Sequence, residues 1–172
     1  MTTKLSIDRS ARLAGILLGV GLAAVALVAW RVPRGERTLG ADVRMEALQT
    51  GPVGVAPLQP FLAKPSLLPG AAVSGSVTLR NQTGVPLALR LRALPSTRDL
   101  NRMLVVKVSA GARALYDGSL EGLRTSGTGP LRLRSGQAQR VQVRASLPAS
   151  LKSGYQGRIV DITLQIDSRT VR

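Results

Sequence analysis

The sequence predicts an all-β protein, an antiparallel β-sandwich of the jelly-roll or immunoglobulin-like type with about eight strands, preceded by one N-terminal apolar helix. The first observation is that apolar and polar residues alternate in short runs from residue 41 onward, with Gly, Pro, Asn and Asp between the runs. Successive side chains of a strand point to opposite faces, so each run has one apolar and one polar face. The second observation is that no long helical pattern follows residue 30. Short strands separated by turn residues indicate a sandwich.

The N-terminal residues indicate export. Residues 1–12 are basic, residues 13–30 contain no charged side chain, and Arg31 follows. A basic segment before an apolar run is typical of a signal peptide, and a helix of this length spans about 27 Å, enough for a membrane anchor. Cleavage after Ala26 or Ala29 would release the domain, whereas Trp30 and the flanking basic residues favour a retained anchor. We therefore assign residues 1–30 to a signal peptide or a signal-anchor helix, which contacts the membrane through residues 13–30 if it is not cleaved.

The remaining chain divides into a linker, residues 31–40, and a β-sandwich domain, residues 41–172. The strongest strand pattern covers residues 70–92, where two alternating runs flank Asn81 and Gly84 and predict a β-hairpin. Five prolines between residues 50 and 70 predict a wandering connection rather than a central strand. Further strands are expected at residues 41–47, 103–109, 112–116, 131–134, 140–147 and 158–168, with one helical turn at 119–123 and a loop at 125–130.

Arginine dominates the charge of the chain. The formal net charge is +15, from 24 basic and 9 acidic residues, and such a charge would attract an anionic polymer. Outward charges also keep a sheet soluble and protect its edges. No nucleic-acid motif or stacking platform accompanies the charge, so we expect no specific nucleic-acid recognition. Six arginines at outward strand positions would form one basic stripe if their strands were neighbours, and they are the candidate polyanion-binding residues: Arg90, Arg92, Arg132, Arg134, Arg140 and Arg144.

The residue inventory argues against catalysis. The chain has no Cys and no His, which removes disulfides, the Ser-His-Asp triad and every His-ligated metal site. It also has no GxSxG motif and no phosphate-binding glycine motif. Asp117 and Glu121 lie near one turn, but a calcium site usually needs more oxygen ligands. We expect a non-enzymatic protein without a cofactor or a metal.

Four segments of the chain follow one another in the order and spacing of a known family. They are LGADV at residues 39–43, the predicted hairpin at residues 69–92, YDGSL at residues 116–120, and LP at residues 147–148 followed by QG at residues 156–157 and the last strand. Together they resemble the TasA and camelysin-like proteins, which bacteria export to the cell surface or the biofilm matrix. The resemblance covers roughly residues 39–168. The chain departs from the family where residues 31–34 are basic rather than aromatic and acidic, and where the last strand carries Ile and Leu rather than Phe.

The resemblance implies a non-enzymatic exported subunit of a cell-surface or biofilm-matrix assembly that associates with itself into a fibre. It implies polymerisation by β-strand addition, in which a terminal segment of one subunit completes the sheet of the next. The candidate donor segment, residues 31–39, includes Arg31, Val32, Pro33 and Leu39. Camelysin-like members are described as metalloproteases, but a chain without His gives no basis for extending that activity to it. The alternative is a membrane-tethered envelope domain that binds a polyanion or a partner protein through an Arg-rich face.

Overall fold

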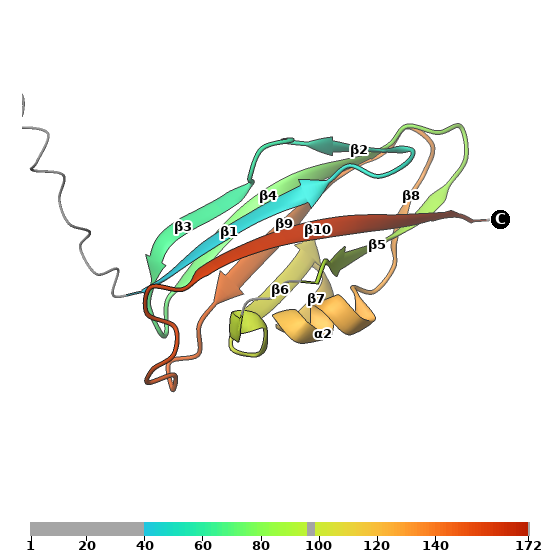
Figure 1. Ribbon diagram of the computed structural model, residues 1–172. Helices are drawn as coiled ribbons and strands as arrows, with labels where there is room; N and C mark the ends of the chain where they lie inside the picture. Colours follow the sequence, from blue (N-terminus) through green and yellow to red (C-terminus); the bar gives the residue numbers. More distant parts are fainter. Residues whose placement is uncertain (1–39, 96–98, 172) are drawn as a thin grey trace, which may run out of the picture. The chain divides into compact units, whose positions relative to one another are not determined.

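The computed structural model describes residues 40–95 and 99–171, and within them ten strands form two five-stranded sheets (Figure 1). Sheet A has the strand order β3-β1-β10-β5-β8, and sheet B has the order β2-β4-β9-β6-β7. Sheet A consists of β1 (Ala41–Leu48), β3 (Leu62–Leu67), β5 (Leu87–Ala93), β8 (Leu131–Leu133) and β10 (Ile159–Thr170). Sheet B consists of β2 (Val53–Ala56), β4 (Ala72–Asn81), β6 (Val105–Ala110), β7 (Arg113–Ser119) and β9 (Ala138–Ser146). The predicted all-β class is confirmed.

Several predictions concern residues outside this description. The N-terminal apolar helix, the candidate cleavage sites Ala26 and Ala29, and the candidate donor segment at residues 31–39 all lie outside the described residues. Within residues 40–95 and 99–171, no helix is both long enough and apolar enough to cross a membrane.

The inward side chains of both sheets form one aliphatic core. In β9, Val141 and Val143 are buried while Gln142 and Arg144 are exposed, as the alternation predicts. Every described strand contributes at least one residue to the same buried cluster. Burying a Val or Leu side chain stabilises a fold by about 1.5–3 kcal/mol, so a Cys-free domain of this kind depends on its core for stability.

One strand pair departs from the predicted antiparallel arrangement. β1 and β10 pair in parallel, with Val43 opposite Val160 and Ala47 opposite Leu164. The other pairs of described strands are antiparallel. The side-chain period is two in both kinds of sheet, so alternation alone does not determine the direction of pairing. The parallel pair places the first and last strands of the domain side by side.

The predicted hairpin at residues 70–92 is wrong, although both of its strands exist. β4 belongs to sheet B and β5 to sheet A, so the chain crosses between the sheets after Asn81. Asn81 is fully buried, and its Nδ2 lies 2.8 Å from the Val85 carbonyl oxygen and 3.0 Å from that of Arg134. Its Oδ1 accepts a hydrogen bond from the Thr83 N–H at 2.9 Å. The residues that suggest a hairpin turn therefore hold the corner where the chain changes sheet.

The proline-rich segment contributes two edge strands instead of a connection without strands. β2 lies at the edge of sheet B and β3 at the edge of sheet A, so the number of strands exceeds the predicted eight. Pro65 lies within β3, where an edge position leaves its missing N–H without consequence. The prolines were thus a correct indication that no central strand forms there.

The predicted helical turn is confirmed as the short helix α2 (Leu120–Ser126). Ser119 is its N-cap, and the Ser119 Oγ accepts a hydrogen bond from the Gly122 N–H at 3.1 Å. Leu120 and Leu123 are buried against the core, as their spacing of three residues predicts. A 3-10 helix, η1 (Asp99–Arg102), precedes β6.

Thr128 ties the loop after α2 to sheet A. It is 2 % exposed, its N–H donates to the Leu91 carbonyl oxygen at 2.8 Å, and its Oγ1 accepts from the Leu91 N–H at 3.0 Å. Thr128 thereby extends the pairing of β8 with β5 to a residue that precedes Leu131, the first residue of β8.

Replacing Thr128 with Val is expected to lower the free energy of unfolding by about 2 kcal/mol, because a buried Leu91 N–H then has no acceptor. Thr125→Val is the matched control, since Thr125 is exposed, and we expect it to change the free energy by less than about 0.5 kcal/mol. Urea unfolding of both variants measures the difference, and equal effects would contradict a specific role for the Thr128 hydroxyl.

Candidate functional site

One side of β4 is paired along only part of its length. On one side β4 pairs with β9 from Ala72 to Arg80, whereas on the other side β2 covers only Thr78 to Asn81. Alternate residues of a strand direct their N–H and C=O groups to opposite neighbours. The Asn81 N–H donates to Gln137 on the β9 side at 2.9 Å, so the even-numbered residues of β4 face the β2 side. Ala72, Ser74 and Ser76 therefore direct their backbone groups toward a region that β2 does not reach.

We call the backbone of Ala72, Ser74 and Ser76 on this side the open β4 edge. β2 ends at Ala56, and the cis peptide bond to Pro57 begins the passage of the chain to sheet A. The Phe61 N–H donates to the Met45 carbonyl oxygen at 3.1 Å, so Phe61 already follows β1 of the other sheet. No described residue forms a backbone hydrogen bond with the open β4 edge.

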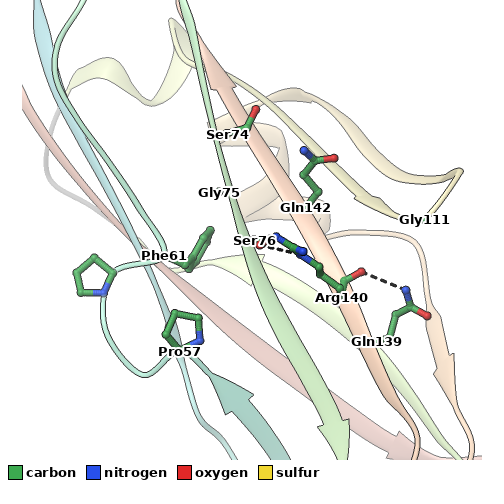
Figure 2. A pocket seen from close by; sticks show the side chains of 10 residues that line it. Pro57, Phe61, Ser74, Gly75, Ser76, Gly111, Gln139, Arg140 and Gln142 are labelled. Carbon is green, nitrogen blue, oxygen red and sulfur yellow. Dashed lines mark hydrogen bonds between the residues drawn. The ribbon is translucent and has the colours of Figure 1, made fainter.

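A hollow of about 800 Å³ lies beside the open β4 edge and continues over the outer face of sheet B. Figure 2 shows Pro57 and Phe61 on one side of β4, and Arg140 and Gln142 of β9 on the other. The Arg140 Nε donates to the Ser76 Oγ at 2.9 Å. The remaining lining residues are Pro60, Ser74, Gly75, Gly111 and Gln139.

The six candidate polyanion-binding arginines do not form one stripe. Arg90 and Arg92 lie on β5 and Arg132 lies on β8, all in sheet A, whereas Arg140 and Arg144 lie on β9 in sheet B. The exposed Arg134 follows β8 in the connection to β9. The separation arises in the connection from β8 to β9, where the chain passes from sheet A to sheet B between Leu133 and Ala138.

The two sheets differ in charge. The strands of sheet A contain six basic and four acidic residues, and the acids lie among the bases, with Arg44 opposite Asp161 and Asp167 opposite Arg90. The strands of sheet B contain five basic residues and one acidic residue, Asp117. Sequence reasoning missed the basic residues that β4, β6 and β7 add to sheet B, because their alternation was visible but the order of strands was not: Arg80, Lys107 and Arg113.

The acidic residues near α2 have basic partners. Asp117 lies 2.8 Å from the Lys107 Nζ, and Glu121 accepts hydrogen bonds from Arg124. The hydrogen bond from Arg124 lowers the pKa of Glu121 below its ordinary value. Partial burial raises the pKa of Tyr116, whose hydroxyl donates to the Ser119 carbonyl oxygen at 2.6 Å. Within the described residues, no group of three or more acidic side chains is placed to hold a metal ion.

Comparison with known proteins adds little to this geometry. No family model and no curated protein matches the chain. Among solved structures, the chain is similar to AvmM, described as catalysing macrocyclization in alchivemycin A biosynthesis, with 14% identity and a TM-score of 0.34. The match covers 69% of this chain and 88% of AvmM. A likeness of this size supports no argument about the function of the chain.

Proposed function

We propose that the chain is a non-enzymatic exported subunit of a cell-surface or biofilm-matrix assembly, similar to TasA, and that its subunits join by β-strand addition at the open β4 edge. The subunit is a β-sandwich of the jelly-roll or immunoglobulin-like type preceded by an N-terminal apolar helix. One observation carries the proposal. The backbone N–H and C=O groups of Ser74 and Ser76 point toward the space beyond the end of β2, where no described strand pairs with them. Such groups are a template for another strand.

The open β4 edge differs from the other edges of the two sheets. Proteins protect sheet edges with charge, proline or short strands. β3 carries Lys64 and Pro65, β7 carries Arg113 and Asp117, and β8 has three residues. Residues 72–77 of β4 contain neither a charged residue nor a proline. This is the edge at which an added strand meets the least opposition.

An added strand would continue the line of β2, antiparallel to β4. The hollow beside Pro57 and Phe61 provides space for its side chains. The proposed donor is the segment of residues 31–39 from a neighbouring copy, in which Pro33 can form no N–H hydrogen bond. Signal cleavage after Ala26 or Ala29 would free this segment for exchange.

Replacing Ser76 with Pro is expected to abolish assembly, because the Pro lacks the N–H that the added strand requires. The fold is expected to persist, since the Ser76 N–H faces away from β9 and forms no bond within the sheet. Ser76→Ala is the matched control: it also loses the hydroxyl but keeps the N–H, and it should assemble like the wild type. Sedimentation velocity and electron microscopy of the full chain measure assembly. Equal assembly of both variants would contradict the proposal.

The charge of sheet B favours a second candidate function, a membrane-tethered envelope domain that binds an anionic polymer or a partner protein. The excess of five basic residues over one acidic residue supports it. The salt dependence of binding distinguishes the two functions. Binding to a polyanion weakens steeply as the salt concentration rises, because it depends on counterion release. The backbone hydrogen bonds of an added strand persist at high salt. The N-terminal sequence of protein recovered from cells and from the medium shows whether the anchor is retained.

A further inference from the structure

The outer face of sheet B carries two neighbouring hollows. The hollow of about 800 Å³ over β4 and β9 shares Ser74 and Gln142 with a second hollow of about 370 Å³ over β6 and β7. Together they extend across four adjacent strands of the sheet. We call this surface the sheet B trough.

The register of the strands places uncharged polar groups in the middle of the trough. Ser76 lies opposite Gln142, and Gln142 lies opposite Ser109 on the next strand. Arg140 and Arg144 lie two residues on either side of Gln142 along β9, about 14 Å apart at the rise of an antiparallel strand. The trough is therefore a row of hydroxyl and amide groups with a cation toward each end.

These two arginines are available to a ligand. Lys107 is neutralised by Asp117, whose Oδ2 lies 2.8 Å away. Among the described residues, neither Arg140 nor Arg144 has an ion-pair partner. Ser76 holds the Nε of Arg140, which leaves the two terminal nitrogens of the guanidinium to face a carboxylate. The hydrogen bond to Ser76 thus orients Arg140 before a ligand arrives.

We propose that the sheet B trough binds a carboxylate-bearing polysaccharide, with Arg140 holding a carboxylate and Ser74, Ser76 and Gln142 holding sugar hydroxyls. Neutral hydrogen-bonding groups outnumber the cations, which suits a polymer rich in hydroxyls with separated charges. A nucleic acid carries one charge per nucleotide and needs aromatic stacking, whereas the aromatic side chain of the larger hollow is the half-buried Phe61. Beside Pro57, Phe61 offers an apolar wall to the C–H face of a sugar ring.

The polysaccharide and an added strand would share the hollow beside Pro57 and Phe61, but they would use different groups of the protein. The polysaccharide contacts side chains on the outer face, whereas assembly depends on backbone groups of the open β4 edge. Variants of Arg140 and Gln142 leave the backbone N–H of Ser76 in place, so the two proposals can fail separately.

Calorimetric titration of the full chain with an oligogalacturonate, and with its methyl ester of the same length, tests the proposal. Arg140→Gln is expected to weaken binding of the acid about tenfold and to change binding of the ester by less than about twofold. Gln142→Ala is expected to weaken binding of both sugars by a similar factor, because it removes a contact to hydroxyls.

Arg90→Gln is the matched control, since it removes the same charge from the outer face of sheet A. It should change the affinity by less than about twofold. Equal losses from Arg90→Gln and Arg140→Gln would overturn the site, because binding would then follow net charge alone. No binding of the oligogalacturonate, or tighter binding of single-stranded DNA or polyphosphate, would overturn the choice of a polysaccharide ligand.

Discussion

Replacing Gly75 with Ala is expected to lower the free energy of unfolding by about 3 kcal/mol, although Ala normally favours a strand over Gly. Gly75 lies in β4, next to Phe61 and Leu62 at the start of β3. A Cβ at this position would lie 2.3 Å from the Phe61 carbonyl oxygen and 2.8 Å from the Leu62 Cβ. The obstacle is the backbone of Phe61 and the Cβ of Leu62, so no side-chain rotation relieves the clash.

Gly84→Ala is the control for Gly75→Ala. A Cβ at Gly84 meets no atom within 4 Å, so the same chemical change is expected to alter the free energy by less than about 0.5 kcal/mol. Urea unfolding followed by circular dichroism gives both values. A Gly75→Ala variant as stable as the wild type would show that β3 and β4 do not approach as described.

Replacing Asn81 with Asp is expected to cost about 3 kcal/mol, because a carboxylate cannot donate to the carbonyl oxygens of Val85 and Arg134. The new charge would also be fully buried among these oxygens. The loss should appear as a lower unfolding midpoint and as faster hydrogen exchange in the corner between β4 and β5.

Gln82→Glu makes the same amide-to-carboxylate change one residue later, at an exposed position. It is expected to leave the unfolding midpoint nearly unchanged. If both variants lose the same stability, net charge and not the Asn81 hydrogen bonds would account for the effect.

The sequence predicted individual strands well because alternation is a local property. Residues such as Val141 and Val143 are buried as predicted, and the Leu120–Leu123 spacing identified α2. Strand partners could not be predicted in the same way. Asn81 is a common turn residue, and only its burial against the β8–β9 connection shows that it holds a crossing between sheets.

The candidate site was even less accessible to sequence reasoning. The open β4 edge exists because β2 stops at Ala56, opposite Thr78, while β4 begins at Ala72, and this depends on the register of two strands that are not consecutive in the chain. The arginines of the supposed stripe were correctly placed on outward positions, yet Arg90 and Arg140 lie in different sheets. The prolines between residues 50 and 70 did indicate that no central strand forms there, and β2 and β3 are edge strands.

Hydrogen exchange at the backbone amides of Ser74 and Ser76, compared between the unassembled chain and the assembly, tests strand addition most directly. We predict that both amides exchange rapidly in the unassembled chain and slowly in the assembly. The Val77 amide, which faces β9, should be protected in both states and serves as the internal reference. Rapid exchange of Ser74 and Ser76 within an assembly would contradict strand addition at the open β4 edge.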